Sequence, residues 1–223
     1  MDLDPVSLSS LHTLQRVFCT NSFSWAGERV AEDAAADAWA GSALSGIGGW
    51  FRALESNKLF WFHLEIEQGQ LPDLWLWPEK MQAAICALEL LAQLALVLAR
   101  AKVDGNAQLH CVRLRQYGDN MPVVAACSKG MSTAPPLCFA LMALVFAALE
   151  LQVALELSHV AGERNEEADL LSRLNHPEAK PWPLFMRAKF SEANRVRIAL
   201  ADVLAPWYKF MQRPSSLIEF DRP

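Results

Sequence analysis

The sequence predicts an α/β domain in which a five-stranded mixed sheet carries helices on both faces. Three observations support this fold class. Apolar and polar side chains alternate through residues 58–66, as they do in a half-buried strand. Two strongly apolar segments, 83–99 and 137–149, have the length of buried helices. With 52% apolar residues and eight Trp, the 223-residue chain can also build a sizeable core.

The first three elements read as strands joined by short connections. We expect strands over 28–38, 45–51 and 58–66, which would form an antiparallel meander. The first is rich in alanine, a residue of low β propensity. The second is rich in glycine over 46–49, and glycine permits close approach of another backbone.

Helices and strands alternate in the second half of the chain. Pro72 and Pro78 bracket a Trp-rich connection, after which helix signals run over 79–102. The elements expected next are a strand over 109–117, helices over 122–128 and 137–153, a strand over 154–160 and a helix over 165–174. Strands joined through helices are parallel with a right-handed crossover, so the first, fourth and fifth strands should be parallel.

The domain predicted from this order covers residues 28–175. Residues 1–27 read as a leader or linker. Residues 176–223 read as a partly helical extension with one amphipathic helix over about 190–204. The extension either packs on the domain or docks elsewhere.

Charge and cysteine usage limit the functional classes. The formal net charge is −5, whereas general nucleic-acid binders are usually basic, so strong autonomous binding is disfavoured. The five Cys have no metal-site spacing, and the amino terminus is acidic rather than signal-like, which favours a reduced intracellular protein, either cytoplasmic or nuclear. A membrane span is disfavoured because segment 137–149 is too short and Glu89 interrupts the other segment.

The most informative motif is His-Val-Ala-Gly-Glu-Arg-Asn-Glu-Glu-Ala-Asp-Leu-Leu-Ser-Arg, residues 159–173. It reads as a strand end, a tight turn at Gly162 and a helix capped by Asn165, with acids in the first turn. This string resembles the last motif of the ribonuclease H domain of retroelement reverse transcriptases, especially gypsy-type and DIRS-type elements. The order of elements also matches the ribonuclease H-like fold.

The resemblance implies four metal-binding acids, on the first strand, the first helix, the end of the fourth strand and the last helix. The matching residues are Asp37, Glu89, Asp119 and Asp169. Asp33 is an alternative to Asp37, because the two share a face if their strand is continuous. Glu89 is the only acid between residues 81 and 99, and a buried carboxylate needs a partner or a metal.

The implied activity is hydrolysis of the RNA strand of RNA–DNA hybrids by a metal-dependent endoribonuclease. The implied cofactor is a pair of Mg²⁺ ions, for which Mn²⁺ is expected to substitute, and such pairs support in-line phosphodiester cleavage. His159 matches a family histidine that assists proton transfer or product release. Arg164, Ser172 and Arg173 are further phosphate-contact candidates. The implied partners are the hybrid and a reverse transcriptase polymerase domain.

Two other functions remain open. One is a catalytically weak or dead scaffold of a retroelement polyprotein, which the acidic composition favours and the four acids oppose. The other is a transposase or integrase, but those resemble an Asp-Asp-Glu order, whereas here the Glu comes second. Polymerase palm motifs are absent, so we expect a processed piece or a stand-alone descendant. His63, His110 and His176 read as ordinary, partly exposed histidines, and Ala161 stands where relatives often carry Pro.

Overall fold

The strands and helices follow the predicted order along the chain. A computed structural model describes residues 29–176, 179 and 181–212. Its strands are β1 (Arg29–Ala31), β2 (Ala34–Ala40), β3 (Leu44–Arg52), β4 (Leu59–Glu67), β5 (Val112–Gly118) and β6 (Ala154–His159). Its α-helices are α2 (Ile85–Asp104), α3 (Asn106–Leu109), α4 (Met121–Lys129), α5 (Leu137–Leu151), α6 (Glu166–Ser172), α7 (Leu184–Lys189) and α8 (Leu200–Met211).

The sheet is mixed, as predicted. Strands β2, β3 and β4 form an antiparallel meander, whereas β5 is parallel to β2 and β6 is parallel to β5. Strand β1 is also parallel to β5. Arg113 and Leu114 of β5 pair with both β1 and β6, so these two strands lie on opposite edges of β5. Strands β1 and β2 therefore share one edge of β5, and the six strands fill the five positions of the predicted sheet.

The expectation of one continuous first strand over 28–38 is wrong. The strand is divided at Glu32 and Asp33, and Asp33 has a φ of 57°. This left-handed conformation is uncommon for a residue other than glycine and interrupts a β ladder. Arg115 of β5 forms an ion pair with Glu32, one of the two residues at the break. Asp33 and Asp37 consequently do not lie on one regular strand.

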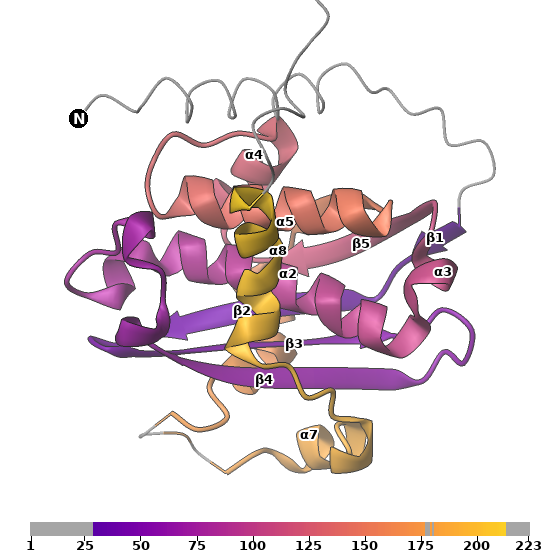
Figure 1. Ribbon diagram of the computed structural model, residues 1–223. Helices are drawn as coiled ribbons and strands as arrows, with labels where there is room; N and C mark the ends of the chain where they lie inside the picture. Colours follow the sequence, from indigo (N-terminus) through magenta and orange to yellow (C-terminus); the bar gives the residue numbers. More distant parts are fainter. Residues whose placement is uncertain (1–28, 177–178, 180, 213–223) are drawn as a thin grey trace, which may run out of the picture.

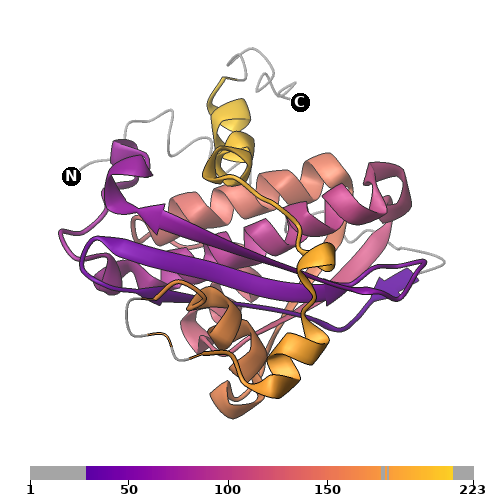
Figure 2. The ribbon, with the colours of Figure 1, turned by 90° about the horizontal axis from the view of Figure 1, so that it is seen from below.

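Helices cover both faces of the sheet (Figures 1 and 2). Helices α2 and α5 pack together on one face, where α2 contacts β2 and β3. Helix α6 contacts β2, β3 and β4 from the other face, on the side where α7 also lies. Helix α8 packs against α5 and α2, as the outermost helix of its side (Figure 2).

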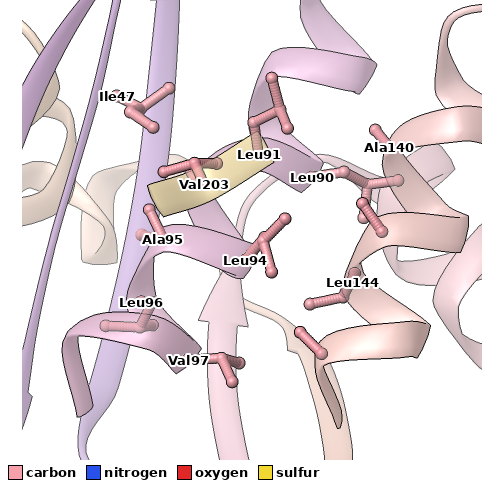
Figure 3. Packing of buried hydrophobic residues seen from close by; sticks show 14 of the residues in the cluster. Ile47, Leu90, Leu91, Leu94, Ala95, Leu96, Val97, Ala140, Leu144 and Val203 are labelled. Carbon is pink, nitrogen blue, oxygen red and sulfur yellow. The ribbon is translucent and has the colours of Figure 1, made fainter. Parts of the chain in front are cut away.

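The main core lies between the sheet and helices α2 and α5. Leu90, Leu91 and Leu94 of α2 are fully buried, among Ile47 of β3 and Leu144 of α5 (Figure 3). Residues 81–104 are long and apolar enough to cross a membrane by composition alone, but 72% of their most apolar window is buried inside the protein. The segment is thus the core helix that the sequence predicts.

The carboxyl-terminal helix differs from its expected position. It covers Leu200–Met211 rather than 190–204. The preceding chain is extended because the Val196 amide donates to the Trp61 carbonyl oxygen over 2.7 Å, and Arg195 bridges to the same β4 residue. Val203 and Trp207 then bury the apolar side of α8.

Part of the sequence-based interpretation concerns residues outside this description. The leader or linker over 1–27 and Cys19 lie outside the described residues. The other four cysteines, at 86, 111, 127 and 138, are free thiols, of which Cys138 is buried and Cys111 is exposed.

Candidate metal centre

Three acidic side chains from three elements meet at one point. Asp37 on β2, Glu89 on α2 and Asp119 just beyond β5 each offer a carboxylate oxygen, and these oxygens lie within 4.8 Å of one another. Strands β2 and β5 pair in register at Ala35 and Tyr117, and two residues further along each strand are Asp37 and Asp119. Such an all-oxygen donor set fits a hard divalent cation such as Mg²⁺.

Asp169 lies beside this group but is not one of the three converging acids. It belongs to α6, and its carboxylate lies near enough to Asp37 to help raise the pKa of Asp37. Its Oδ1 also accepts a 2.6 Å hydrogen bond from Arg173 Nε, one turn further along the helix. The structure therefore brings all four predicted acids to one edge of the sheet, with Asp169 partly neutralised by Arg173.

Helix α6 reaches this edge by packing directly on the glycines of β3. A Cβ added at Gly48 would lie 2.4 Å from the backbone of Leu171 and Ser172. A Cβ at Gly46 would lie 2.3 Å from the Ser172 carbonyl oxygen. The close backbone approach expected of the glycine-rich strand is thus made by the helix that carries Asp169.

His63 is a functional-site contact that the sequence did not reveal. It was expected to be partly exposed, but it is buried, and its Nδ1 donates to the Leu171 carbonyl oxygen over 2.8 Å. The polar face of β4 is covered because α6 packs there. His63 therefore ties β4 to the helix of Asp169. Burial lowers the pKa of His63, which favours the neutral ring.

Burial and mutual repulsion shift the protonation of the two deepest acids. The pKa of Asp37 is raised to about 8 by burial and then by the charges of Asp119 and Asp169. The pKa of Glu89 is raised to about 9 by burial and then by Asp37 and Asp119, against the opposing hydrogen bond with Asn120. A divalent cation supplies the positive charge that such a cluster needs to ionise fully, which is a second reason why the residues fit a metal.

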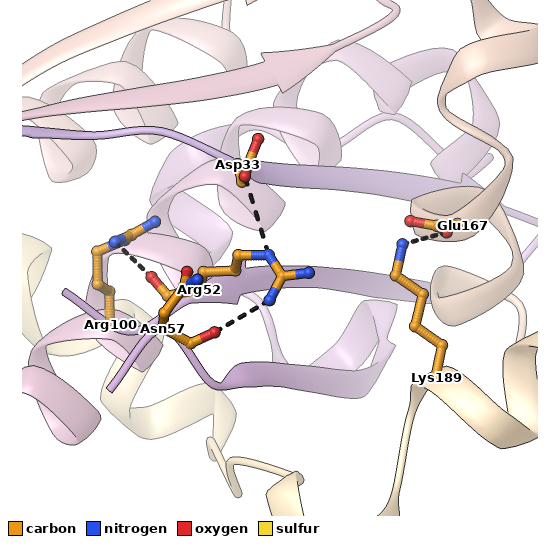
Figure 4. Close-up of polar contacts among 6 residues, drawn as sticks. All are labelled: Asp33, Arg52, Asn57, Arg100, Glu167 and Lys189. Atoms are coloured by element: carbon orange, nitrogen blue, oxygen red, sulfur yellow. Dashed lines mark hydrogen bonds and ion pairs between the residues drawn. The ribbon is translucent and has the colours of Figure 1, made fainter. Parts of the chain in front are cut away.

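Asp33, the alternative first acid, lies apart from the group. Its side chain is mostly exposed and faces Arg52, whose Nε is 3.8 Å from Asp33 Oδ2 (Figure 4). Arg52 also donates to the carbonyl oxygen of Asn57 (Figure 4). Asp33 lies in the break between β1 and β2, whereas Asp37 lies within β2. Of these two candidates for the first acid, Asp37 is therefore the one that joins the cluster.

The remaining predicted site residues differ in their surroundings. His159 ends β6, is exposed, and pairs in register with Gly118, the residue before Asp119. Arg164 is exposed. Ser172, in contrast, is fully buried and its hydroxyl donates to the Asp169 carbonyl oxygen over 2.8 Å, so a phosphate contact by Ser172 is excluded in this arrangement.

Two asparagines that precede helices at the site differ in whether they cap them. Asn165 precedes α6 as predicted, but its buried side chain makes no capping hydrogen bond. Asn120 is the effective cap on the other side of the site, because its Oδ1 accepts from the Val123 amide over 3.2 Å. Of the other histidines, His110 is exposed and His176 is half-buried against the Trp39 ring.

No protein-family model matches the chain, and no curated protein matches it significantly. Among solved structures the chain is similar to RNase H1 from the halophilic archaeon Halobacterium salinarum, with 18% identity and a TM-score of 0.44 over 66% of this chain and 96% of that one. It is also similar to LC11-RNase H1, isolated from compost by a metagenomic approach, with 17% identity and a TM-score of 0.43 over 63% of this chain and 91% of that one.

Proposed function

We propose that the protein is a divalent-metal-dependent endoribonuclease that hydrolyses the RNA strand of RNA–DNA hybrids. The observation that carries the proposal is the convergence of Asp37, Glu89 and Asp119, whose carboxylate oxygens lie within 4.8 Å of one another although they come from three elements. The motif over residues 159–173 supports the further proposal that the domain derives from a retroelement reverse transcriptase and works beside its polymerase domain within the cell.

Each acid has a distinct task in this proposal. Asp37, Glu89 and Asp119 would hold the cations, either Mg²⁺ or Mn²⁺, from one side of the cluster, and Asp169 would close it from α6. Bound cations would supply positive charge that stabilises the phosphate in the transition state of hydrolysis. Arg173 holds the Asp169 carboxylate in place before substrate arrives.

In this proposal the substrate lies on the side of the centre where β6 ends. His159 is exposed at the end of β6, next to the strand end that carries Asp119. From there its ring would transfer a proton or assist release of the product. Selectivity for a hybrid would come from contacts to 2′-hydroxyl groups and to backbone shape rather than from base reading.

The proposal is tested by cleavage of a labelled RNA–DNA hybrid with Mg²⁺, with EDTA, and with an Asp169→Asn protein. We expect cleavage only of the RNA strand, its loss in EDTA, and its loss to background in Asp169→Asn. Asp33→Asn is the matched control, because this acid is exposed and lies apart from the cluster; it should retain wild-type cleavage. A folded wild-type protein that binds Mg²⁺ without cleaving any hybrid would instead support the scaffold function.

A further inference from the structure

Gln93 connects the elements that carry three of the four acids. It lies one turn after Glu89 on α2 and is 1% exposed. Its Nε2 donates to the Ala36 carbonyl oxygen of β2 over 3.3 Å and to the Tyr117 carbonyl oxygen of β5 over 3.2 Å. One side-chain amide from the helix therefore contacts both neighbouring strands.

These contacts occur where β2 and β5 stop pairing. The two strands share one register pair, Ala35 with Tyr117, immediately beside the two carbonyl groups that Gln93 contacts. Buried carbonyl groups need hydrogen-bond donors, and the Gln93 amide donates to both of these groups. Gly118 leaves room for the amide, because a Cβ there would lie 3.1 Å from Gln93 Nε2.

Both contacted carbonyl groups lie close in sequence to the acids. Ala36 directly precedes Asp37, and Tyr117 is two residues before Asp119. Since Glu89 is on the same helix as Gln93, a shift of the amide changes the spacing among all three elements. We infer that Gln93 is a positioning residue that fixes the separation of Asp37, Glu89 and Asp119 for binding a divalent cation. This inference deepens the proposed function and rests on its metal site.

A purely structural role would be shared by other buried amides, and the chain contains a suitable comparison. Gln116 lies on β5, is also fully buried, and its side-chain atoms have no hydrogen-bond partner among the described residues. Gln93 and Gln116 therefore match in residue type and burial but differ in their contacts to the strands of Asp37 and Asp119.

The experiment uses the full chain as wild type, Gln93→Met and Gln116→Met, since methionine keeps the length of the side chain without its amide. Mg²⁺ affinity is measured well below each melting temperature by calorimetry and by the NMR shifts of backbone amides near Asp37 and Asp119. We expect Gln93→Met to weaken Mg²⁺ binding on the order of 10-fold, as loss of an outer-shell contact does. Gln116→Met should bind Mg²⁺ within about twofold of wild type, because the Gln116 amide makes no hydrogen bond to the backbone of β2 or β5.

An unchanged Mg²⁺ affinity in folded Gln93→Met would overturn the inference, as would an equal loss in Gln116→Met. If Gln93→Met does not fold, the side-chain amide signals of Gln93 in the wild type decide. They should be protected from solvent and shift during the Mg²⁺ titration, and unshifted signals overturn the inference. Hybrid cleavage is assayed separately. A wild type that binds Mg²⁺ but does not cleave contradicts the proposed function and leaves the result for Gln93 intact.

Discussion

Both burial and the negative charge of neighbouring acids oppose ionisation of the Asp37 and Glu89 carboxyl groups. Both are about 95% shielded from solvent and both face further acids. Their ordinary pKa values, 3.8 and 4.5, apply in the unfolded chain, whereas folding raises them to about 8 and about 9. Each group therefore holds its proton more tightly in the folded state than in the unfolded state.

The metal-free protein should accordingly lose stability as pH rises. Between the unfolded and folded pKa values of these acids, the unfolded state releases protons first, so the free energy of unfolding falls from about pH 4 to about pH 9. The slope is at most about 1.4 kcal/mol per pH unit for each group. Urea unfolding in EDTA at a series of pH values measures it.

Two controls separate this effect from general titration of the surface. The double variant Asp37→Asn, Glu89→Gln removes both shifted groups and should show a flatter pH dependence. Saturating Mg²⁺ should stabilise the wild type most at high pH, because ionised carboxylates are the ligands. An identical pH profile for wild type and double variant would show that other groups dominate.

The contacts of His63 and Gln93 could not be predicted from the sequence. Strand alternation placed His63 on the polar face of β4, and nothing local indicated that α6, more than a hundred residues later, covers that face. Gln93 was visible as a polar residue in an apolar segment, but its two carbonyl partners come from β2 and β5. Glu89 could be predicted because its isolation in that segment implies a partner.

At the scale of elements, the contact between α6 and β3 sets the position of Asp169. The two backbones are so close at Gly48 that any side chain there would collide with Leu171 or Ser172. Unlike a flexible side chain, these backbone atoms cannot move without displacing the helix. The glycine thus contributes to the metal centre without belonging to it.

Gly48→Ala should push α6 from the sheet and separate Asp169 from Asp37. We expect the free energy of unfolding to fall by about 1–3 kcal/mol. We expect the rate of hybrid cleavage to fall by a larger fraction than the free energy of unfolding does. Gly69→Ala is the matched control, since a Cβ there has nothing within 4 Å; its stability and cleavage should stay near wild type. Chemical denaturation and single-turnover cleavage measure both effects, and normal cleavage by Gly48→Ala would contradict this dependence.

Elements with a clear period were predicted well, and those fixed by tertiary contacts were not. β4 and α5 follow their predicted ranges within about two residues because alternation and continuous apolar length are local signals. The division between β1 and β2 depends on the left-handed Asp33 and on a pairing with β5, which alanine-rich sequence does not encode locally. The segment before α8 is extended because Val196 pairs with Trp61, a contact that local helical patterning cannot anticipate.

For the whole molecule, the topology explains how distant acids converge. Parallel pairing of β5 with β2 places the end of β5 beside Asp37, and helices α2 and α6, which pack on opposite faces of the sheet, bring Glu89 and Asp169 to the same place. The predicted mixed sheet already implies this convergence once the four elements are assigned. The break between β1 and β2, which sets Asp33 apart from the other acids, required the structure.

The charge of the whole molecule bears on how it meets a nucleic acid. The formal net charge is −5. Many cationic side chains are also engaged in ion pairs: Lys102 with Asp202, Arg115 with Glu32 and Glu156, Arg173 with Asp169, Lys189 with Glu167 (Figure 4), and Lys209 with Glu150. A Lys or Arg side chain that is already paired with an acid neutralises a phosphate less readily than an unpaired one. Its binding therefore releases fewer counterions from the nucleic acid.

We therefore expect the isolated chain to bind an RNA–DNA hybrid weakly and with a shallow dependence of the logarithm of the association constant on log salt. A slope near −1 or −2 would correspond to roughly one or two neutralised phosphates. Fusion of a basic nucleic-acid-binding domain should lower Kd and KM while leaving the single-turnover rate at saturation unchanged, because the metal centre is the same. Fluorescence anisotropy of a labelled hybrid between low and moderate salt, in Ca²⁺ to prevent cleavage, measures the slope. A slope of about −5 or steeper for the lone chain would mean that its ion pairs open to form a basic groove, and net charge would then be a poor guide to its affinity.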